Sequence, residues 1–389
     1  MKLAKWFRAC FGFLMFLGCL AVFAQTPEEP ALAKDLNEEV HRIEVTVKDL
    51  YNRTETRKIP LTVFKPNGDG PFPLVVLNHG RAGSPDKRAQ PLRFRYEQQA
   101  RYLVNKGFVV IVPTRVGYGE AFGDFDPETN GGCSLPQIEP LSMAASEQVL
   151  ATHSFAKSLK FVDTSRWWVM GQSVGGLTTV ATVWRNPPGL QGGINFAGGT
   201  GGDPVARPGQ SCGTNQIARL WKNKAKDAQA NMLWLYWEND LFWGAQAPRD
   251  WHQAWTEGGG RAQFHQLPAF GKDGHAGFTS DMDHWVPLVD AYLAKSGYTQ
   301  SALPPVSEPS GFADVADLGK VPISADNVQK LYTRFLSSPA PRAFAIGPNG
   351  AAGFAYGDWA IGRALGFCQA RRGAPCKLYA VDQQVVWRN

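Results

Sequence analysis

The pattern of apolar and polar positions predicts a short antiparallel entry to the fold. Between residues 41 and 65 apolar residues recur at alternate positions, three on each side of a break near Asn52-Arg53. A period of two residues is typical of a half-buried strand, so we expect a β-hairpin that turns at this break. The alternating apolar residues are Ile43, Val45, Val47, Ile59, Leu61 and Val63.

Beyond residue 70 the pattern changes to short apolar runs that alternate with helical stretches. Parallel strands need a crossover connection, usually a helix, so this order predicts an α/β fold: a mostly parallel sheet with helices on both faces. In such sheets chemistry collects at the carboxyl ends of the strands. The expected strands are 73–77, 108–112, 167–170, 190–196, 232–237 and 262–267, and the expected helices are 94–105, 141–159, 174–184, 215–225 and 283–294.

After residue 296 the chain loosens and then forms a second pattern. Residues 301–309 are rich in Ser and Pro and are typical of a linker, and 324–338 predicts one helix. Beyond Pro341 we expect a small α+β module, with short strands and one helix that carries an apolar stripe at Ile361, Leu365 and Cys368. The expected strands are 343–346, 353–356 and 378–387, the last as a single strand.

The first 24 residues match a secretory signal peptide. Residues 1–8 are basic, and 9–24 are apolar without a charge. A helix of about sixteen residues reaches about 24 Å, short of the roughly 30 Å hydrocarbon core of a bilayer. Val22-Phe23-Ala24 offers the small residues that a signal peptidase reads, so we expect cleavage after Ala24 and a periplasmic or secreted protein. The alternatives are an uncleaved anchor and a lipoprotein site at Cys19.

These patterns divide the chain into four expected parts. They are a signal peptide at 1–24, a catalytic domain at 25–298, a linker with a connecting helix at 299–340, and the small module at 341–389. Once the signal is removed, no stable membrane insertion is expected.

Composition narrows the classes of protein. Hydrophobic residues make up 44% and charged residues 19% of the 389, which allows a large buried core and excludes global disorder. The net charge of +6 collects at the two ends, with three basic residues before residue 9 and six basic against two acidic residues after Pro341. The stretch between is near neutral, so nucleic acid is not an expected partner.

Export changes how the cysteines are interpreted. Four remain after the two in the signal are removed, and an even number in an oxidising compartment favours disulfides. The short spacing favours Cys368–Cys376 as a local clip, which leaves Cys133 with Cys212. A zinc site is the alternative, although no Cys-x2-Cys spacing accompanies these residues. We expect no metal and no cofactor.

The motif that carries chemistry is Gly171-Gln172-Ser173-Val174-Gly175, which fits G-x-S-x-G. It lies between an expected strand and an expected helix. A nucleophile on such a sharp turn needs small neighbours two residues away on each side, and Gly171 and Gly175 provide them. The helix N-terminus behind the serine offers free N–H groups to an anion. We predict Ser173 as a nucleophile; the alternative is a Gly-rich turn with an idle serine.

A serine hydroxyl needs a base, and the base needs an orienting carboxylate. His275 lies in a Gly-rich loop after the last expected strand, and we prefer it to His284 at a helix start. Asp240 lies beyond the strand 232–237, and we prefer it to Glu238. The chain order Ser, Asp, His is that of α/β-hydrolases.

Three further features bear on the site. The oxyanion needs two donors, and we expect the backbone N–H groups of Arg81 and Val174, with Gly80 as the alternative to Arg81. His79, beside that turn, is expected to be structural. The segment 81–115 holds eight basic and two acidic residues, which indicates either a basic rim that favours an anionic substrate or a solvated surface. The aromatic residues of 234–243 either wall a pocket or pack in the core.

Several of these pieces resemble the dienelactone-hydrolase-like branch of the α/β-hydrolase superfamily, with prolyl-oligopeptidase-like esterases nearby. The resemblance covers roughly residues 44–295. It implies an α/β-hydrolase fold and cleavage of a small-molecule carboxylic ester through a covalent serine ester. The enzyme that names the family carries a cysteine nucleophile where this chain has Ser173, which disfavours dienelactone itself. The matching pieces are 73–81, 112–119, 171–176, 238–240 and 272–278.

Other functions stay open at this point. A serine peptidase uses the same three residue types, and a non-catalytic binding protein can keep the same scaffold. The run 343–382 resembles the small Cys-bridged tail module of uncharacterised exported bacterial proteins, a resemblance that implies no activity. The sequence predicts no oligomeric state.

Overall fold

The computed structural model describes residues 29, 31–90, 92–323, 326–372 and 375–388, so the predicted signal peptide at 1–24 lies outside the described residues. The chain from Ala31 onward forms one compact unit. After η1 (Lys34–Leu36), strand β1 (Glu39–Lys48) pairs antiparallel with β2 (Thr54–Phe64). Asn52 turns between them with a φ of 64°. The predicted hairpin is therefore confirmed.

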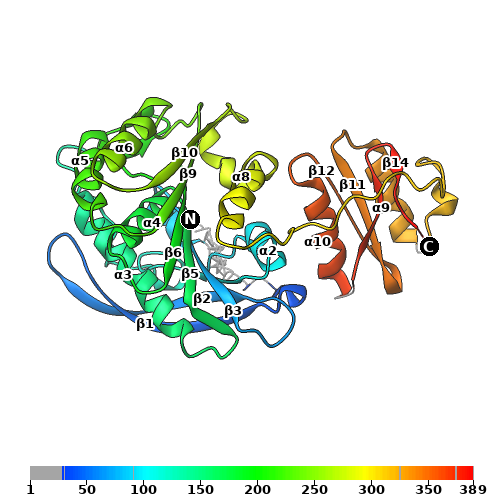
Figure 1. Ribbon diagram of the computed structural model, residues 1–389, viewed down its shortest axis with the longest axis horizontal. Helices are drawn as coiled ribbons and strands as arrows, with labels where there is room; N and C mark the ends of the chain where they lie inside the picture. The colour runs from blue at the N-terminus through cyan, green and yellow to red at the C-terminus, as the bar shows by residue number, and fades with distance from the viewer. Residues whose placement is uncertain (1–28, 30, 91, 324–325, 373–374, 389) are drawn as a thin grey trace, which may run out of the picture. The chain divides into compact units, whose positions relative to one another are not determined.

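The larger sheet has eight strands in the order β1-β2-β4-β3-β5-β6-β9-β10 (Figure 1). Strand β2 is antiparallel to both of its neighbours, and every pair from β4 to β10 is parallel. The mostly parallel sheet that the alternating pattern predicts is confirmed. The remaining strands are β3 (Phe72–Asn78), β4 (Val109–Pro113), β5 (Val162–Gln172), β6 (Leu190–Phe196), β9 (Asn231–Trp237) and β10 (Ala262–Leu267).

Helices cover both faces of this sheet. One face packs against α3 (Ile138–Ala156), α4 (Val174–Trp184), α5 (Thr214–Ala225) and α6 (Gln246–Glu257). The other packs against α2 (Glu97–Asn105) and α8 (Met282–Ala294). These helices agree with the predicted ones except α6, which the apolar pattern does not indicate.

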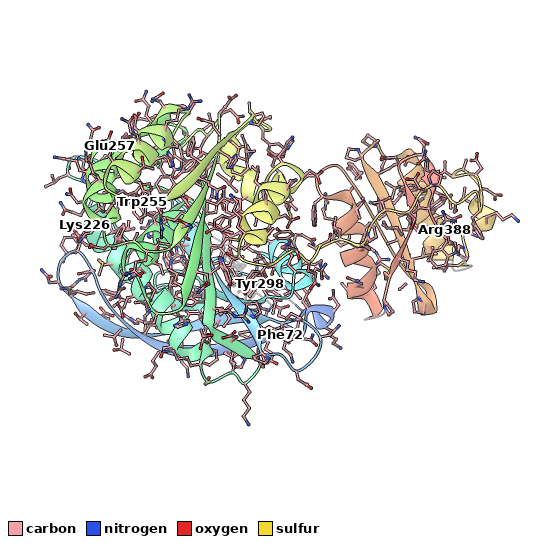
Figure 2. All side chains as sticks on the ribbon, viewed as in Figure 1. Phe72, Lys226, Trp255, Glu257, Tyr298 and Arg388 are labelled. Atoms are coloured by element: carbon pink, nitrogen blue, oxygen red, sulfur yellow. A yellow bond between two sulfur atoms is a disulfide. The ribbon has the colours of Figure 1, made fainter. Side chains whose placement is uncertain are left out.

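Four residues of helix α6 are buried, namely Ala247, Pro248, Trp251 and Trp255, and the two tryptophans are the largest of them. Trp251 and Trp255 are fully buried four positions apart, among polar neighbours. Figure 2 labels Trp255 together with Glu257, which forms an exposed ion pair with Lys222 of α5. Two tryptophan side chains supply the apolar contact that smaller residues would spread over several turns.

Short elements occupy the loops of the large sheet. They are α1 (Pro85–Ala89), η2 (Gly119–Ala121), β7 (Gly202–Asp203), β8 (Arg207–Ser211), η3 (Gly274–Ala276) and α7 (Gly277–Ser280). Strands β7 and β8 form a separate two-stranded sheet between β6 and α5. The sequence pattern does not predict this excursion, which carries Arg207 and leads to Cys212.

The C-terminal sheet has four antiparallel strands in the order β12-β11-β13-β14. After η4 (Leu318–Lys320), α9 (Asp326–Ser337) packs against one face and α10 (Ala360–Arg372) against the other (Figure 1). Helix α9 thus contributes to the core of this sheet. The strands are β11 (Arg342–Gly347), β12 (Ala351–Tyr356), β13 (Lys377–Val381) and β14 (Gln384–Val385), and η5 (Pro348–Gly350) joins the first two.

The single last strand expected at 378–387 is wrong, because the chain turns back on itself there. Asp382 has a φ of 51°, and β13 and β14 pair antiparallel on either side of it. The Asp382 carboxylate accepts a hydrogen bond from the backbone N–H of Arg342 at 2.8 Å, which holds the turn against β11.

Both predicted disulfides are present. Cys133 pairs with Cys212 across 79 residues, and Cys368 pairs with Cys376 across 8. The zinc alternative is thereby replaced, since all four sulfurs are in disulfides. Within the described ranges, no helix is long and apolar enough to cross a bilayer.

Candidate active site

Ser173 stands on a sharp turn between β5 and α4. Its φ of 58° and ψ of −124° lie in a region that residues with a Cβ rarely adopt. Its backbone N–H donates to the carbonyl of Phe196 at 2.9 Å, and its own carbonyl accepts from the N–H of Leu177 at 3.0 Å. The surrounding structure therefore holds the serine in a strained conformation at the carboxyl end of the sheet.

The glycines of the motif are required by close approach of the backbone. A Cβ on Gly171 would lie 2.3 Å from the carbonyl oxygen of Gly175. A Cβ on Gly175 would lie 2.2 Å from the carbonyl oxygen of Asn78, at the end of β3. The turn is thus packed so tightly that neither position has room for a side chain. This is the steric reason for the two glycines that the G-x-S-x-G motif predicts.

Asp240 and His275 meet at the same end of the sheet. The Asp240 carboxylate, 1% exposed, lies 2.9 Å from Nδ1 of His275 through its Oδ2 atom. Its Oδ1 atom accepts the backbone N–H groups of Phe242 at 2.7 Å and Trp243 at 3.1 Å. The carboxylate is therefore held in place, and it orients the imidazole with Nδ1 towards itself and Nε2 away.

The two competing residues lie elsewhere. Glu238 is exposed. The His284 side chain is 60% exposed and pairs with Asp281 in the first turn of α8. The hydrogen bond that His284 donates to the Asp281 carboxylate raises the pKa of His284. The geometry therefore favours Asp240 and His275 over both alternatives.

Contacts around His275 connect it to the serine turn. The Gln172 side chain, next to Ser173, donates to the carbonyl of His275 at 2.7 Å. Phe242 stacks on the imidazole with ring centroids 4.0 Å apart, and it also lines the cavity that contains Ser173. The Ser173 hydroxyl and the His275 ring, both within the described part of the chain, form no direct hydrogen bond. Such bonds are often long in enzymes without substrate.

Three polar residues that the sequence does not single out fasten the histidine loop. Gln172 is the first of them. The second is Asp273, whose carboxylate accepts the N–H of His275 at 3.0 Å and that of Leu241 at 2.9 Å. Asp273 thereby connects the segment after β10 that carries His275 (the histidine loop) to the segment after β9 that carries Asp240 (the acid loop). Asn239 accepts the N–H of Phe270 at 2.9 Å. The sequence shows that these three residues lie close to Ser173, His275 and Asp240. It does not show the hydrogen-bond partners through which they hold the loop.

The two expected oxyanion donors face the same space as the serine. Val174 is the first residue of α4, and Arg81 follows β3; both line the cavity with Ser173. Neither backbone N–H has a hydrogen-bond acceptor among the described residues. Gly80 brings the two segments together, since a Cβ there would lie 3.1 Å from Cβ of Ser173.

His79 is structural, as the sequence indicates. It is fully buried and stacks on Phe94 with centroids 3.8 Å apart. Nε2 accepts the N–H of Arg115 at 3.1 Å, so the proton on Nδ1 faces the carbonyl of Gly80 at 2.7 Å. Burial, together with the nearby Arg115 guanidinium, lowers the pKa of His79 well below 6.5.

The cavity beside Ser173 has a volume of about 230 Å³. Arg207 of β8 lines it and has no carboxylate partner among the described residues; its Nε atom is buried without a hydrogen bond. Its Nη2 atom donates to Sγ of Cys133 at 3.2 Å. A larger cavity of about 740 Å³ lies between the β1–β2 turn and α3, and it contains none of the three predicted catalytic residues.

The basic segment 81–115 does not form a free rim. Its arginines and one lysine pair with acids from distant parts of the chain, and several pairs are buried. The pairs are Arg81–Asp126, Arg88–Asp126, Arg93–Glu38, Arg95–Glu38, Arg101–Asp35, Lys106–Asp290 and Arg115–Glu128. The paired charges therefore connect this segment to other parts of the chain, so they form neither a free basic rim nor a freely solvated surface; of these residues, Arg81 and Glu128 line the cavity.

The aromatic residues of the acid loop divide between the two expected roles. Trp234, Tyr236 and Trp237 are fully buried in the cores on the two faces of the sheet. Phe242 and Trp243 line the cavity with Ser173. The Nε1 atom of Trp243 donates to the carbonyl of Ala197 at 2.7 Å, which holds that wall in position.

The strand order, the antiparallel β2 and a strained serine between a central strand and the next helix together decide the architecture. The chain has an α/β-hydrolase fold. Ser173, Asp240 and His275 follow β5, β9 and β10, so they come from the ends of three strands in the chain order Ser, Asp, His that is typical of this fold.

Some solved structures are similar to this chain at low sequence identity. No protein-family model and no curated protein matches the chain. Similar solved structures include a protein from Klebsiella pneumoniae assigned as a dienelactone hydrolase, at 16% identity and a TM-score of 0.44 over 66% of this chain and 99% of that one. An esterase from Pyrococcus furiosus has 12% identity and a TM-score of 0.47 over 69% and 96%.

A third similar structure belongs to a longer protein. The acylaminoacyl peptidase of Pyrococcus horikoshii has 14% identity and a TM-score of 0.43 over 66% of this chain, which spans 41% of the peptidase. The assignment of the fold rests on the strand order and the serine turn.

Proposed function

We propose that this protein is an exported serine hydrolase that cleaves carboxylic esters. Ser173 is the nucleophile, His275 the general base and Asp240 the residue that orients the base. The observation that carries the proposal is the buried Asp240–His275 pair beside a serine held at positive φ. This combination costs backbone strain and buried charge, which a merely structural turn does not need.

The proposed reaction is acyl transfer. His275 takes the proton of Ser173 as the hydroxyl attacks the ester carbonyl, and it then protonates the leaving alcohol. The N–H groups of Arg81 and Val174 stabilise the oxyanion of the tetrahedral intermediate. Water attacks the acyl-enzyme in a second round of the same steps and releases the acid.

The cavity favours a small acyl group with a negative charge. Its volume of about 230 Å³ is below the usual range for drug-sized ligands. Arg207 brings to its wall a guanidinium that forms no ion pair within the described chain, with a buried Nε donor that lacks a partner; Asp203, which pairs with Arg207 between β7 and β8, lines the same cavity and interacts with this charge. A carboxylate on the substrate would satisfy that donor and pair with the charge.

The export part of the proposal is supported by the disulfides. Both are typical of an oxidising compartment, and Cys133–Cys212 lies at the cavity, where Cys133 is a lining residue. The signal peptide itself stays a prediction.

The decisive test uses a fluorophosphonate label and a series of nitrophenyl esters on wild type and Ser173→Ala. We expect labelling to disappear in the variant and hydrolysis to fall by about 10⁴–10⁶-fold. Equal labelling of the two proteins would refute the nucleophile. Faster turnover of aminoacyl amides than of esters would favour a peptidase, and no turnover of either would favour a binding protein.

A matched pair of substrates tests the charge of the cavity. A hemisuccinate ester and its methyl-capped analogue differ by one carboxylate. We expect Arg207→Gln to lower kcat/KM for the charged ester by about tenfold and to leave the neutral ester nearly unchanged.

A further inference from the structure

The C-terminal sheet leaves one strand edge open. Strand β12 is the outermost strand, paired only with β11. The N–H of Gly357 donates to the carbonyl of Pro341 at 2.7 Å, so Gly357 is a hydrogen-bonded position of the β11–β12 pair. In an antiparallel pair, hydrogen-bonded and non-hydrogen-bonded positions alternate along the strand. The N–H groups of Phe354 and Tyr356 therefore point away from β11, and neither has an acceptor among the described residues.

A groove runs along this edge. We call it the β12 groove; its volume is about 340 Å³. Residues of β12 form its floor, and α9 and α10 supply its two walls, since they pack on opposite faces of the sheet. Tyr356 and Phe367 line it and are 50% and 40% exposed. The lining residues are Leu331, Arg334, Gly353, Phe354, Ala355, Tyr356, Arg363, Phe367 and Arg371.

The charge of the β12 groove has a single sign. Arg334 comes from α9, and Arg363 and Arg371 come from α10. Within the described chain, none of the three pairs with a carboxylate. The two acids that follow Pro341 are engaged elsewhere, because Asp358 accepts the N–H groups of Met282 and Asp283, and Asp382 accepts that of Arg342.

We propose that the β12 groove binds an extended acidic peptide, which adds to the sheet as a strand beside β12. The outward N–H groups of Phe354 and Tyr356 would pair with the peptide backbone, as in other cases of strand addition, whereas the carbonyl of Tyr356 accepts from Nη1 of Arg363 at 3.3 Å. The three guanidinium groups would pair with its carboxylates. This binding site is independent of the hydrolase reaction.

The α10 wall also predicts a spacing in the peptide. Arg363, Phe367 and Arg371 follow one another at intervals of four along α10. Eight residues of helix rise about 12 Å, close to the roughly 13 Å that separates residues i and i+4 of a strand. An acidic residue, an apolar residue and a second acidic residue at alternate positions would therefore meet Arg363, Phe367 and Arg371 in turn.

The test uses the full chain and a fluorescein-labelled peptide of sequence Thr-Glu-Thr-Val-Thr-Glu-Thr, with binding followed by fluorescence anisotropy. We expect saturable binding that weakens as salt is added. A peptide with Lys in place of Glu should not bind. A peptide with methyl groups on alternate backbone nitrogens should bind at least about tenfold more weakly, because it cannot complete the strand ladder.

Two pairs of variants separate the contributions. Arg334→Gln with Arg371→Gln should weaken binding about tenfold, whereas Arg219→Gln with Lys226→Gln, which removes two exposed charges from α5 and its C-cap, should leave it unchanged. Tyr356→Pro removes the outward N–H as well as the ring, and Tyr356→Thr removes only the ring. We expect the proline variant to bind more weakly than the threonine variant, with ester hydrolysis and thermal unfolding unchanged in both.

Several results would overturn the proposal. They are no binding of the acidic peptide, equal binding of the Lys or N-methylated peptide, and an equal loss in the α5 control. Sedimentation that shows a dimer broken by Tyr356→Pro would assign the edge to a second copy of this chain instead.

Discussion

The two sheets of this protein differ in whether the polar groups beside them are buried or exposed. In the large sheet the polar side chains of the candidate site are withdrawn from water: Asp240 is 1% exposed, and Ser173 and His275 are 8% exposed. Each meets a specific backbone or side-chain neighbour. In the small sheet the outward N–H groups of Phe354 and Tyr356 have no partner among the described residues, and Arg334 and Arg371 are exposed near the rings of Tyr356 and Phe367.

This difference follows from the size and direction of the sheets. A parallel sheet is covered on both faces, so its polar chemistry is confined to the loops at the strand ends, where neighbouring loops can enclose it. A four-stranded antiparallel sheet has a free edge that its two helices cannot cover. Enclosure suits a reaction centre, and an open edge suits the capture of another chain.

Loss of the orienting carboxylate should have the largest effect, and only on the large sheet. Asp240→Asn keeps the size of the side chain but no longer favours the required tautomer of His275. By analogy with other triads, kcat should fall by about 10⁴, while peptide binding at the β12 groove stays unchanged. Steady-state ester kinetics measure this, with Glu238→Gln as the control. Comparable losses in the two variants would mean that the acid is misassigned.

Each region contains one disulfide, so the contributions of the two bonds to the free energy of unfolding can be compared. Cys133–Cys212 closes 79 residues and Cys368–Cys376 closes 8. The chain-entropy model gives about 4.5 kcal/mol for the longer loop and about 2.5 kcal/mol for the shorter. Denaturant unfolding of the two double Cys→Ser variants should show this order. A larger loss for the short loop would indicate that the C-terminal module depends on its clip more than chain entropy requires.

The response to acid should also separate the regions, since all seven histidines precede residue 285. His79 is buried with its pKa well below 6.5, whereas in the unfolded chain it binds a proton near pH 6.5. The unfolded state therefore binds more protons as the pH falls below about 6.5. The free energy of unfolding should then decrease by up to about 1.4 kcal/mol per pH unit, and it should be fully regained above pH 6.5.

His79→Gln isolates this contribution. Urea unfolding of wild type and variant at pH 7.5 and at pH 5.5 should give a smaller loss on acidification in the variant. Parallel losses in the two proteins would mean that other groups account for the acid sensitivity.

The smallest effect concerns the contact between the two regions. Asp358 of the C-terminal module accepts the N–H groups of Met282 and Asp283 at 2.9 Å each, and Asp283 accepts that of Trp359 at 3.0 Å. Asp358→Ala removes a cap from α8 and should lower the free energy of unfolding by about 1 kcal/mol. Asp69→Ala, at an exposed turn, is the control. Two separate unfolding transitions in Asp358→Ala would show that this contact couples the regions.

Much of the fold and the identity of the three candidate catalytic residues could be predicted from local sequence. The strands β6 and β10 and the helix α4 have the bounds that the apolar pattern predicts, because burial on one or both faces imposes a period on the residues themselves. Ser173 could be singled out because the glycines around it are needed by the turn, whatever lies beyond. Asp240 and His275 followed from their places after successive strands.

Only the tertiary structure decided which distant groups meet. The sequence shows that the segment 81–115 is basic, yet not that Arg93 meets Glu38 or that Lys106 meets Asp290. It does not show that Gln172 and Asp273 hold the histidine loop, that Arg207 reaches the cavity, or that β12 is an outer strand. Periodicity records which side of an element is buried, but the partner of a polar side chain is chosen by packing between segments far apart in the chain. That choice leaves no local pattern in the sequence.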